Sequence, residues 1–323
     1  FAAMFAQGKI AEPVLKKTAE LIKADLTTAL VYEFDHLQGE IGAVYAARAG
    51  ESGEVCTAIQ EHYLPRFQGD ALPGSLLGAV MSLSDKWDNI VAAFVLGKEP
   101  TASQDPFAIR RQTLYFIQIL VSHKISAPLG ELIDSSLKIF SAMKPVPPAE
   151  MAEIKNKIVQ FFKGRLVTIF ESEGFDKKLT RAAIFSHSDD AFDLYARASA
   201  LKDIAEKDRA RFDALLTAFK RMANINGAAT GSPDKALFSD EAEHALLAFA
   251  AELHKLGAQK TADPLLHYRT IFSAFAAGKE TVDAFFDNVM VNHEDAKIRA
   301  NRQALLAYAL SAVNTLLDLE QLS

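Results

Sequence analysis

The sequence predicts an all-α protein. Apolar residues recur with the three- and four-residue spacing of helices along most of the 323-residue chain. Almost nothing alternates with a period of two, and runs of β-branched residues are short. No internal repeat recurs at a fixed period. We therefore expect a succession of helices joined by loops.

The length and composition of the chain limit the classes of protein to which it can belong. A chain of 323 residues, half of them hydrophobic, is long enough for two or three domains with sizeable cores. The net charge of −6 argues against a generally basic coat for nucleic acid but leaves local basic patches open. The single cysteine, Cys56, excludes a disulfide framework and a cysteine-based zinc finger. We interpret it as a small buried hydrophobe in a cytoplasmic protein.

The sequence predicts neither a leader nor a membrane-spanning segment. No apolar run reaches about 18 residues without a charge or a breaker, so no membrane span is expected. The chain begins at Phe1 without an initiator methionine and enters apolar sequence directly. This start suggests a piece of a longer protein, or one trimmed at its start.

Two helices are predicted before residue 65. The first covers residues 10–32, where apolar residues fall near one stripe, and the second covers residues 52–63. Between them, Gly39 and Gly42 lie three apart. Glycines at this spacing indicate close backbone packing or a turn into a short helix.

The stretch 75–120 predicts a helical hairpin. On its first helix Trp87 belongs to the apolar stripe and is expected in the core. Asp85 and Asp88 are three apart and share a polar face. The chain then breaks at residues 97–100, which include a glycine and a proline.

The second helix of the hairpin carries two adjacent arginines. Asp105-Pro106 predicts its start, because a capping residue precedes a proline at the first helical position. Arg110 and Arg111 follow within a turn. Two interpretations are open: the aspartates pair with Lys86 or these arginines and join the two helices, or an arginine contacts a phosphate.

The rest of the chain predicts further helices and two boundaries. A helix is expected at 127–141, two or three more across 149–225, and a flexible segment at 226–234. The proline-rich residues 144–148 form the best domain boundary. The final helices are expected near 240–256, 262–277, 279–289 and 294–318. We divide the chain into residues 1–144, 145–205 and 206–323.

Common catalytic motifs are missing. The sequence has no G-x-x-x-x-G-K-[ST], no G-x-G-x-x-G, no H-E-x-x-H and no G-x-S-x-G. Its eight histidines are scattered, and no two lie four apart on a helix. Neither a nucleotide-phosphate cradle of known pattern nor a zinc site is therefore expected.

Six blocks carry a resemblance to a known family. They are 33–51, 61–65, LSDKWDNIVAAF (83–94), PTASQDPFAIRRQTL (100–114), DALLTAFKRMANI (213–225) and FFDNVMVNHEDAKIRANRQALL (285–306). In this order they resemble the β subunit of the bacterial tetrameric glycyl-tRNA synthetase. The resemblance runs from about residue 10 to the end. Because the family's β subunit is about twice this length, the resemblance makes this chain its C-terminal half.

The resemblance implies a ligase subunit. The family enzyme joins glycine to its tRNA using ATP, in an α2β2 complex. Its separate α subunit carries the adenylate-forming site, where ATP and Mg are expected, and its β subunit holds tRNA-Gly. The resemblance therefore implies a cytoplasmic tRNA-binding chain with no cofactor of its own.

The first region resembles the HD superfamily of helical domains. Active members are metal-dependent phosphohydrolases that use a histidine, a His-Asp pair and a later aspartate. In this sequence Lys23-Ala24-Asp25 stands in place of the pair, and Asp85 matches the later aspartate. With the imidazoles lost and the Lys23 ammonium nearby, Asp25 and Asp85 are interpreted as vestigial metal positions, and no metal is expected.

The last region resembles the family's helical-bundle anticodon-binding domain, which brings two basic helices together. Arginine and asparagine suit RNA, because they bind phosphates and base edges. The alternative is that Arg299 or Arg302 forms an ion pair with Glu294, Asp295 or Asp287. The predicted tRNA-binding residues are Lys23, Arg110, Arg111, Lys220, Arg221, Arg299, Asn301 and Arg302.

Two other functions stay open. An HD-type phosphohydrolase would need a metal cluster, and metal analysis of the purified protein would reveal it. A scaffold that docks the α subunit without RNA contact would be protected from hydrogen exchange by that subunit and not by tRNA.

Overall fold

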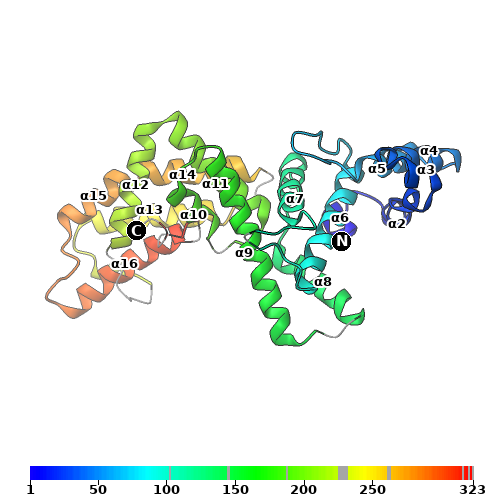
Figure 1. The fold of residues 1–323 in the computed structure, drawn as a ribbon. Helices are drawn as coiled ribbons and strands as arrows, with labels where there is room; N and C mark the ends of the chain where they lie inside the picture. Colours follow the sequence, from blue (N-terminus) through cyan, green and yellow to red (C-terminus); the bar gives the residue numbers. More distant parts are fainter. Residues whose placement is uncertain are drawn as a thin grey trace. The chain divides into compact units, whose positions relative to one another are not determined.

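The computed structural model confirms the all-α prediction. It describes residues 1–101, 103–143, 146–186, 188–224, 232–259, 263–314, 316–318 and 321, without the side chains of residues 215, 218–224 and 313. Within these ranges the regular elements are helices, and an isolated bridge between Pro128 and Asp190 is the extent of β pairing (Figure 1). No helix in the described ranges is long and apolar enough to cross a membrane.

The chain forms two compact units. Unit 1 comprises Phe1–Arg165 and Asp189–Phe192, and unit 2 comprises Leu166–Ser188 and Asp193–Ser323. The division falls inside α9 (Pro148–Ser172), the longest helix described. The three-region division at residues 144 and 205 stays a prediction.

Unit 1 is built around α6 and α7, which pack against each other; α6 also contacts α1 and α5. Its elements are α1 (Ala2–Ala6), α2 (Glu12–Leu21), η1 (Ala24–Thr27), α3 (Ala29–Glu33), η2 (Asp35–Leu37), α4 (Glu40–Arg48), α5 (Gly53–Glu61), α6 (Leu76–Val95), α7 (Ile109–His123), α8 (Leu129–Met143) and the first part of α9.

The helix predicted over 10–32 is wrong, because the chain breaks into α2, η1 and α3. The cause is Asp25, which is buried and accepts a hydrogen bond from the Gly39 amide at 2.6 Å. Gly42 lies against the same side chain, since a Cβ on it would stand 3.1 Å from Asp25 Cβ. A contact with residues 14 to 17 positions away therefore overrides the local helical pattern.

The predicted start of the second hairpin helix is displaced. Ala108 has a left-handed backbone (φ 54°), so α7 begins at Ile109 and Pro106 lies outside it. The N-cap residue is Ala108, so the predicted positions of both Asp105 and Pro106 are wrong. The Asp105 carboxylate still accepts hydrogen bonds from the first two amides of the helix, those of Ile109 and Arg110, at 2.8 and 3.0 Å.

An aromatic cluster holds the helices of unit 1 together. Trp87 is fully buried, as predicted, and its ring centroid lies 5.6 Å from that of Phe116 and 5.8 Å from that of Phe162. Its indole N–H donates to Ser136 Oγ at 2.8 Å. Such aromatic pairs contribute about 0.5–1.5 kcal/mol each beyond area burial. The cluster holds α6, α7, α8 and the unit 1 part of α9 together. Cys56, predicted to be buried, is half-buried beside a second small core.

Unit 2 is a helical bundle. Its elements are the end of α9, α10 (Lys177–Ile184), α11 (Ala191–Lys207), whose first two residues belong to unit 1, α12 (Arg209–Asn224), η3 (Lys235–Leu237), α13 (Glu241–Gly257), α14 (Pro264–Ala277), α15 (Lys279–Asn288) and α16 (Ala296–Asn314). The last four helices lie where they were predicted. Residues 149–224 hold four helices where two or three were expected. Residues 226–231 of the predicted flexible segment lie outside the described residues.

Candidate functional site

The predicted metal positions are engaged in protein contacts. Asp85 forms an ion pair with Lys23 at 3.0 Å, and not with Lys86, Arg110 or Arg111 as one interpretation had it. The Lys23 ammonium also lies 4.7 Å from the centre of the Tyr63 ring. A cation thus stands beside the carboxylate that was predicted to be a vestigial metal position.

Asp25 is held by the protein from a second direction. Besides the Gly39 amide, the Tyr63 hydroxyl donates to it at 3.4 Å. Among the described residues, no group of three or more His, Cys, Asp or Glu side chains is arranged to hold a metal ion. These contacts agree with the interpretation of Asp25 and Asp85 as vestigial, which stays a prediction.

His62 is a buried residue of this region that the sequence did not single out. Its Nδ1 lies 2.6 Å from the Ile59 carbonyl oxygen, which can only accept, so Nδ1 carries the proton. Its Nε2 is buried without a hydrogen-bond partner among the described residues. Burial, and secondly the charge of Lys23, lower the pKa of His62 to about 4. The imidazole is therefore neutral at physiological pH. No spacing to another histidine marked it.

Lys86 is a second buried titratable group. Its ammonium donates to the Leu64 carbonyl oxygen at 2.9 Å and to Ser82 Oγ at 2.7 Å. Burial lowers the pKa of Lys86 to about 8, against the opposing charge of Asp85. This lysine fixes the loop before α6 to the helix and is not the partner of an aspartate.

The two adjacent arginines of α7 have different surroundings. The Arg110 guanidinium donates to the Thr101 carbonyl oxygen and holds the loop that precedes the helix. Arg111 is exposed and makes no hydrogen bond or ion pair with the described part of the chain. Of the two, Arg111 is the one whose donors are available to an anion.

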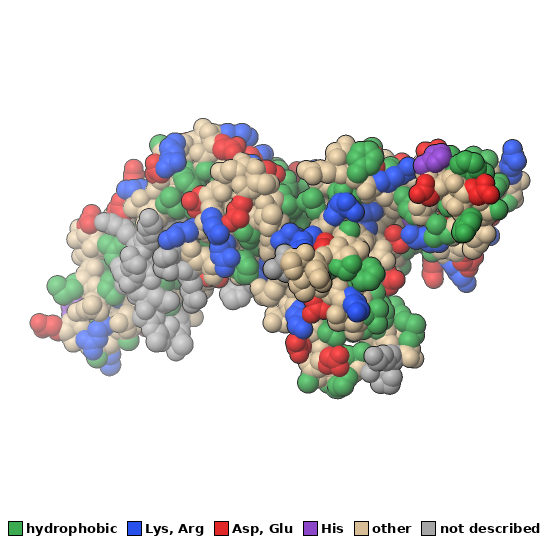
Figure 2. All heavy atoms as spheres, viewed as in Figure 1, with side chains coloured by type: hydrophobic (Ala, Val, Ile, Leu, Met, Phe, Trp, Pro, Cys, Tyr) green, Lys and Arg blue, Asp and Glu red, His purple; other side chains and the backbone are tan. Residues whose placement is uncertain are grey.

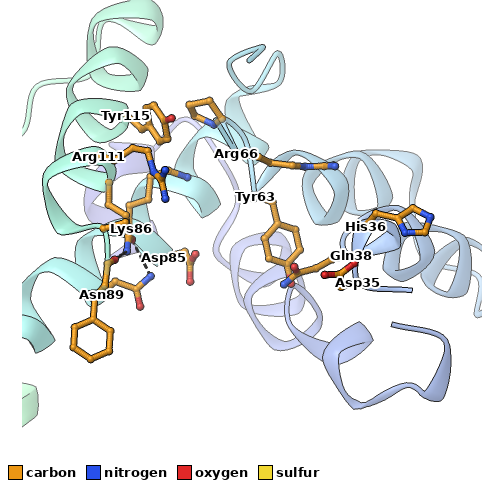
Figure 3. Close-up of a pocket in the computed structure, with 14 residues that line it drawn as sticks. Asp35, His36, Gln38, Tyr63, Arg66, Asp85, Lys86, Asn89, Arg111 and Tyr115 are labelled. Carbon is orange, nitrogen blue, oxygen red and sulfur yellow. Dashed lines mark hydrogen bonds between the residues drawn. The ribbon is translucent and has the colours of Figure 1, made fainter. Parts of the chain in front are cut away.

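Arg111 lines a polar pocket of about 550 Å³ in unit 1. Figure 3 shows Arg111, Tyr115, Lys86 and Asn89 on one wall, facing Tyr63, Gln38, His36 and Asp35 on the other. The first wall comes from α6 and α7, and the second from the η2 region and the end of α5. The remaining lining residues are Pro65, Arg66, Asp85, Phe107, Ala108 and Gln112.

The predicted site residues of α16 serve the packing of unit 2. Arg302 is buried and pairs with the buried carboxylate of Glu243, at 3.0 Å. It also donates to the Met290 carbonyl oxygen and to Ser239 Oγ, both at 2.9 Å. The alternative interpretation, an ion pair with Glu294, Asp295 or Asp287, named the wrong partner for Arg302, because its carboxylate partner, Glu243, lies on α13.

Asn301 and Arg299 bind main-chain atoms. The Asn301 amide accepts from the Asp234 N–H at 2.7 Å and donates to the Asp234 carbonyl oxygen at 2.9 Å. The half-buried Arg299 donates to the carbonyl oxygens of His293 at 2.7 Å and Glu294 at 3.3 Å. Both side chains therefore position loops next to α16, and Arg299 binds carbonyl oxygens where the alternative interpretation placed an ion pair with a carboxylate.

The second basic helix is described only in part. Lys220 and Arg221 lie on α12, but their side chains are outside the described residues. The backbones of α12 and α16 contact each other, as the resemblance implied. On the face shown in Figure 2, lysine and arginine side chains alternate with acidic ones within each unit. Among the described residues visible on that face, basic and acidic side chains are therefore mixed within each unit.

Comparison with known proteins identifies the family. Residues 2–185, more than half of the chain, match the family model of the glycyl-tRNA synthetase beta subunit. The glycine–tRNA ligase beta subunit of Moorella thermoacetica is 37% identical over 315 residues, which cover 96% of this chain and 44% of that protein. The one of Trichlorobacter lovleyi is 39% identical over 291 residues, covering 90% and 41%. The chain thus spans less than half the length of these relatives, and it belongs to the glycyl-tRNA synthetase beta subunit family.

Proposed function

We propose that this chain is the tRNA-binding portion of a glycine–tRNA ligase β subunit in the cytoplasm. It supports the ATP-dependent attachment of glycine to tRNA-Gly in an α2β2 complex, with ATP and Mg bound by the α subunit. Family membership supports the ligase assignment. The lack of any known nucleotide-binding motif in the sequence agrees with placing the adenylate chemistry on the other subunit.

The observation that carries the tRNA-binding part is Arg111. An exposed guanidinium without a partner in the described part of the chain can donate two parallel hydrogen bonds to a phosphate. Arg110 donates to one carbonyl oxygen, Arg299 donates to two through a single nitrogen, and Lys23 pairs with Asp85, so each keeps further donors for RNA. Lys220 and Arg221 complete the proposed contacts.

Arg302 and Asn301 have a different role in this proposal. Their polar groups are committed to Glu243 and Asp234 within unit 2, and both side chains are buried. We assign them to holding α16 in place, so that the exposed part of that helix presents a fixed surface to RNA.

Filter binding of tRNA-Gly to the full-length protein, at several salt concentrations, tests this function. The logarithm of the binding constant should fall linearly with the logarithm of salt concentration, because bound phosphates release counterions. A tRNA of another specificity serves as the control. Absent or salt-insensitive binding of tRNA-Gly would instead favour the scaffold that docks the α subunit without RNA contact.

A further inference from the structure

The pocket of unit 1 contains cations without protein partners. Its charged and titratable lining residues are Asp35, His36, Arg66, Asp85, Lys86 and Arg111. Asp85 is neutralised by Lys23, and the Lys86 ammonium is held by Leu64 and Ser82. The guanidiniums of Arg66 and Arg111 are both exposed and unpaired within the described residues, against the single carboxylate of Asp35. The pocket therefore presents a surplus of positive charge to a ligand.

A buried hydroxyl in the same pocket has no partner. Tyr115 is 4% exposed, and its hydroxyl oxygen is buried without a hydrogen bond to any described residue. Buried polar groups are normally paired, and leaving one unpaired costs about 1–3 kcal/mol. Burial raises the pKa of Tyr115, so the hydroxyl stays protonated and can donate a hydrogen bond. In Figure 3 Tyr115 lies beside Arg111 on one wall of the pocket.

The size and the rim of the pocket narrow the ligand class. A volume of about 550 Å³ lies within the range typical of sites for small molecules. Phe107 lines the pocket and is 54% exposed, which leaves an aromatic face for a planar ring. Two guanidiniums, a free hydroxyl donor and an aromatic face match a phosphate, a ribose and a base.

We propose that this pocket binds a free nucleoside phosphate. The phosphate lies between Arg111 and Arg66, the Tyr115 hydroxyl donates to a phosphate or ribose oxygen, and the base stacks on Phe107. This proposal goes beyond the proposed tRNA-binding function and shares Arg111 with it, so a free nucleotide and a phosphate of tRNA would compete for that guanidinium.

The test is equilibrium dialysis of the full-length subunit, free of its partner subunit, against AMP, GMP, CMP and UMP. The matching nucleosides and inorganic phosphate are run in parallel. At least one nucleotide should bind saturably at one site per chain. Its nucleoside should bind at least about tenfold more weakly, because hydrogen bonds to charged groups contribute about 1.5–3 kcal/mol.

Three variants locate the site. Arg111→Ala should weaken nucleotide binding about tenfold or more. Tyr115→Phe removes one hydroxyl and no packing atom, and should weaken binding about three- to tenfold with an unchanged or raised Tm. Arg48→Ala, at an exposed arginine of α4 outside the pocket, is the matched control and should leave binding unchanged.

Three outcomes would overturn the proposal. The first is that none of the four nucleotides binds. The second is that binding is equal for nucleoside and nucleotide, or unaffected by Arg111→Ala and Tyr115→Phe. The third is that an RNA oligonucleotide binds in an Arg111-dependent manner while no free nucleotide does, which would assign the pocket to the RNA-binding surface.

Discussion

Arg111 of unit 1 and Arg302 of unit 2 have the same predicted role and opposite surroundings. Both are basic residues on helices, and the sequence assigned both to tRNA. Arg302 is buried against Glu243 and two further acceptors. Arg111 is exposed, lines a pocket, and has no hydrogen-bond or ion-pair partner among the described residues. The partner of Arg302 lies 59 positions away in the sequence. The comparison shows that residues distant in the sequence determine whether an arginine on a helix has a structural role or is available to bind a ligand.

Glu243 explains why Arg302 is committed. Its carboxylate accepts from the amides of Ser239 and Asp240 in the capping box of α13, at 2.8 and 3.1 Å. Burial alone would raise the pKa of Glu243, but the hydrogen bonds from Ser239, Arg302 and Asp240 outweigh it and lower the pKa. One carboxylate thus ties the start of α13 to α16.

The largest expected effect comes from removing Arg302. Arg302→Ala should lower the free energy of unfolding by about 3–5 kcal/mol, because it leaves the Glu243 carboxylate buried and unpaired. Urea unfolding followed by circular dichroism measures it. Arg299→Ala, which loses hydrogen bonds to two carbonyl oxygens, is the control and should cost about 1–2 kcal/mol. Equal, small losses for both variants would show that Arg302 is not structural and would remove the contrast with Arg111.

The second effect is an acid sensitivity of unit 1. His62 has a folded-state pKa of about 4, below its unfolded value of 6.5, so the unfolded chain takes up the proton first. The stability it contributes is complete above pH 6.5 and is lost as the pH falls towards 4. Between pH 7.5 and 5 the loss should be about 2 kcal/mol. In unit 2, the contribution of Glu243 has the same sign but is lost only as the pH falls below 4.5, its unfolded value.

Trp87 fluorescence measures this acid effect, because Trp87 is the chain's only tryptophan and lies in unit 1. Urea unfolding at pH 7.5 and 5 is compared for the wild type, His62→Phe and His36→Phe. His62→Phe should remove most of the pH dependence. His36 is exposed, so His36→Phe should keep it. A wild-type pH dependence in His62→Phe would refute the assignment.

A smaller effect is expected at the ion pair between Lys23 and Asp85. Lys23→Met removes the ion pair with Asp85, whose partners are 42% and 21% exposed. Such pairs contribute about 0.2–1 kcal/mol, and the loss should shrink at high salt. Thermal unfolding at low and at high salt would detect it. A loss above 2 kcal/mol would make this pair as structural as the Arg302–Glu243 pair.

The smallest effect on stability is expected at Arg111. Arg111→Ala should change the free energy of unfolding by less than about 0.5 kcal/mol, since the side chain is exposed and has no partner in the described part of the chain. Urea unfolding followed by Trp87 fluorescence checks this. A clear destabilisation would mean that the guanidinium has a structural contact and is not held available for a ligand.

The sequence predicted most helices because their apolar periodicity is local. It also identified the family from ordered blocks, which the comparisons confirm. Prediction from the sequence failed where contacts between distant residues determine the structure. Asp25 interrupts the first predicted helix by accepting a hydrogen bond from Gly39, and Arg302 forms a buried ion pair with Glu243. Neither partner could be inferred from spacing along one helix.

The pocket could not be predicted from the sequence, because it too is formed by residues that are distant along the chain. Its walls come from segments up to 80 positions apart, between Asp35 and Tyr115. The unpaired hydroxyl of Tyr115 and the unpaired Nε2 of His62 are properties of packing. A single tyrosine or histidine in an apolar helix gives no signal that its polar atom lacks a partner.

The most direct test of the account is the salt dependence of tRNA-Gly binding for the wild type, Arg111→Ala and Arg299→Ala. If Arg111 contacts a phosphate, its removal should weaken binding and reduce the slope of log K against log salt concentration by about one. Arg299→Ala, whose side chain is partly committed to carbonyl oxygens, should have the smaller effect. An unchanged slope for Arg111→Ala in a folded protein would contradict the claim that the unpaired arginine of unit 1 serves RNA.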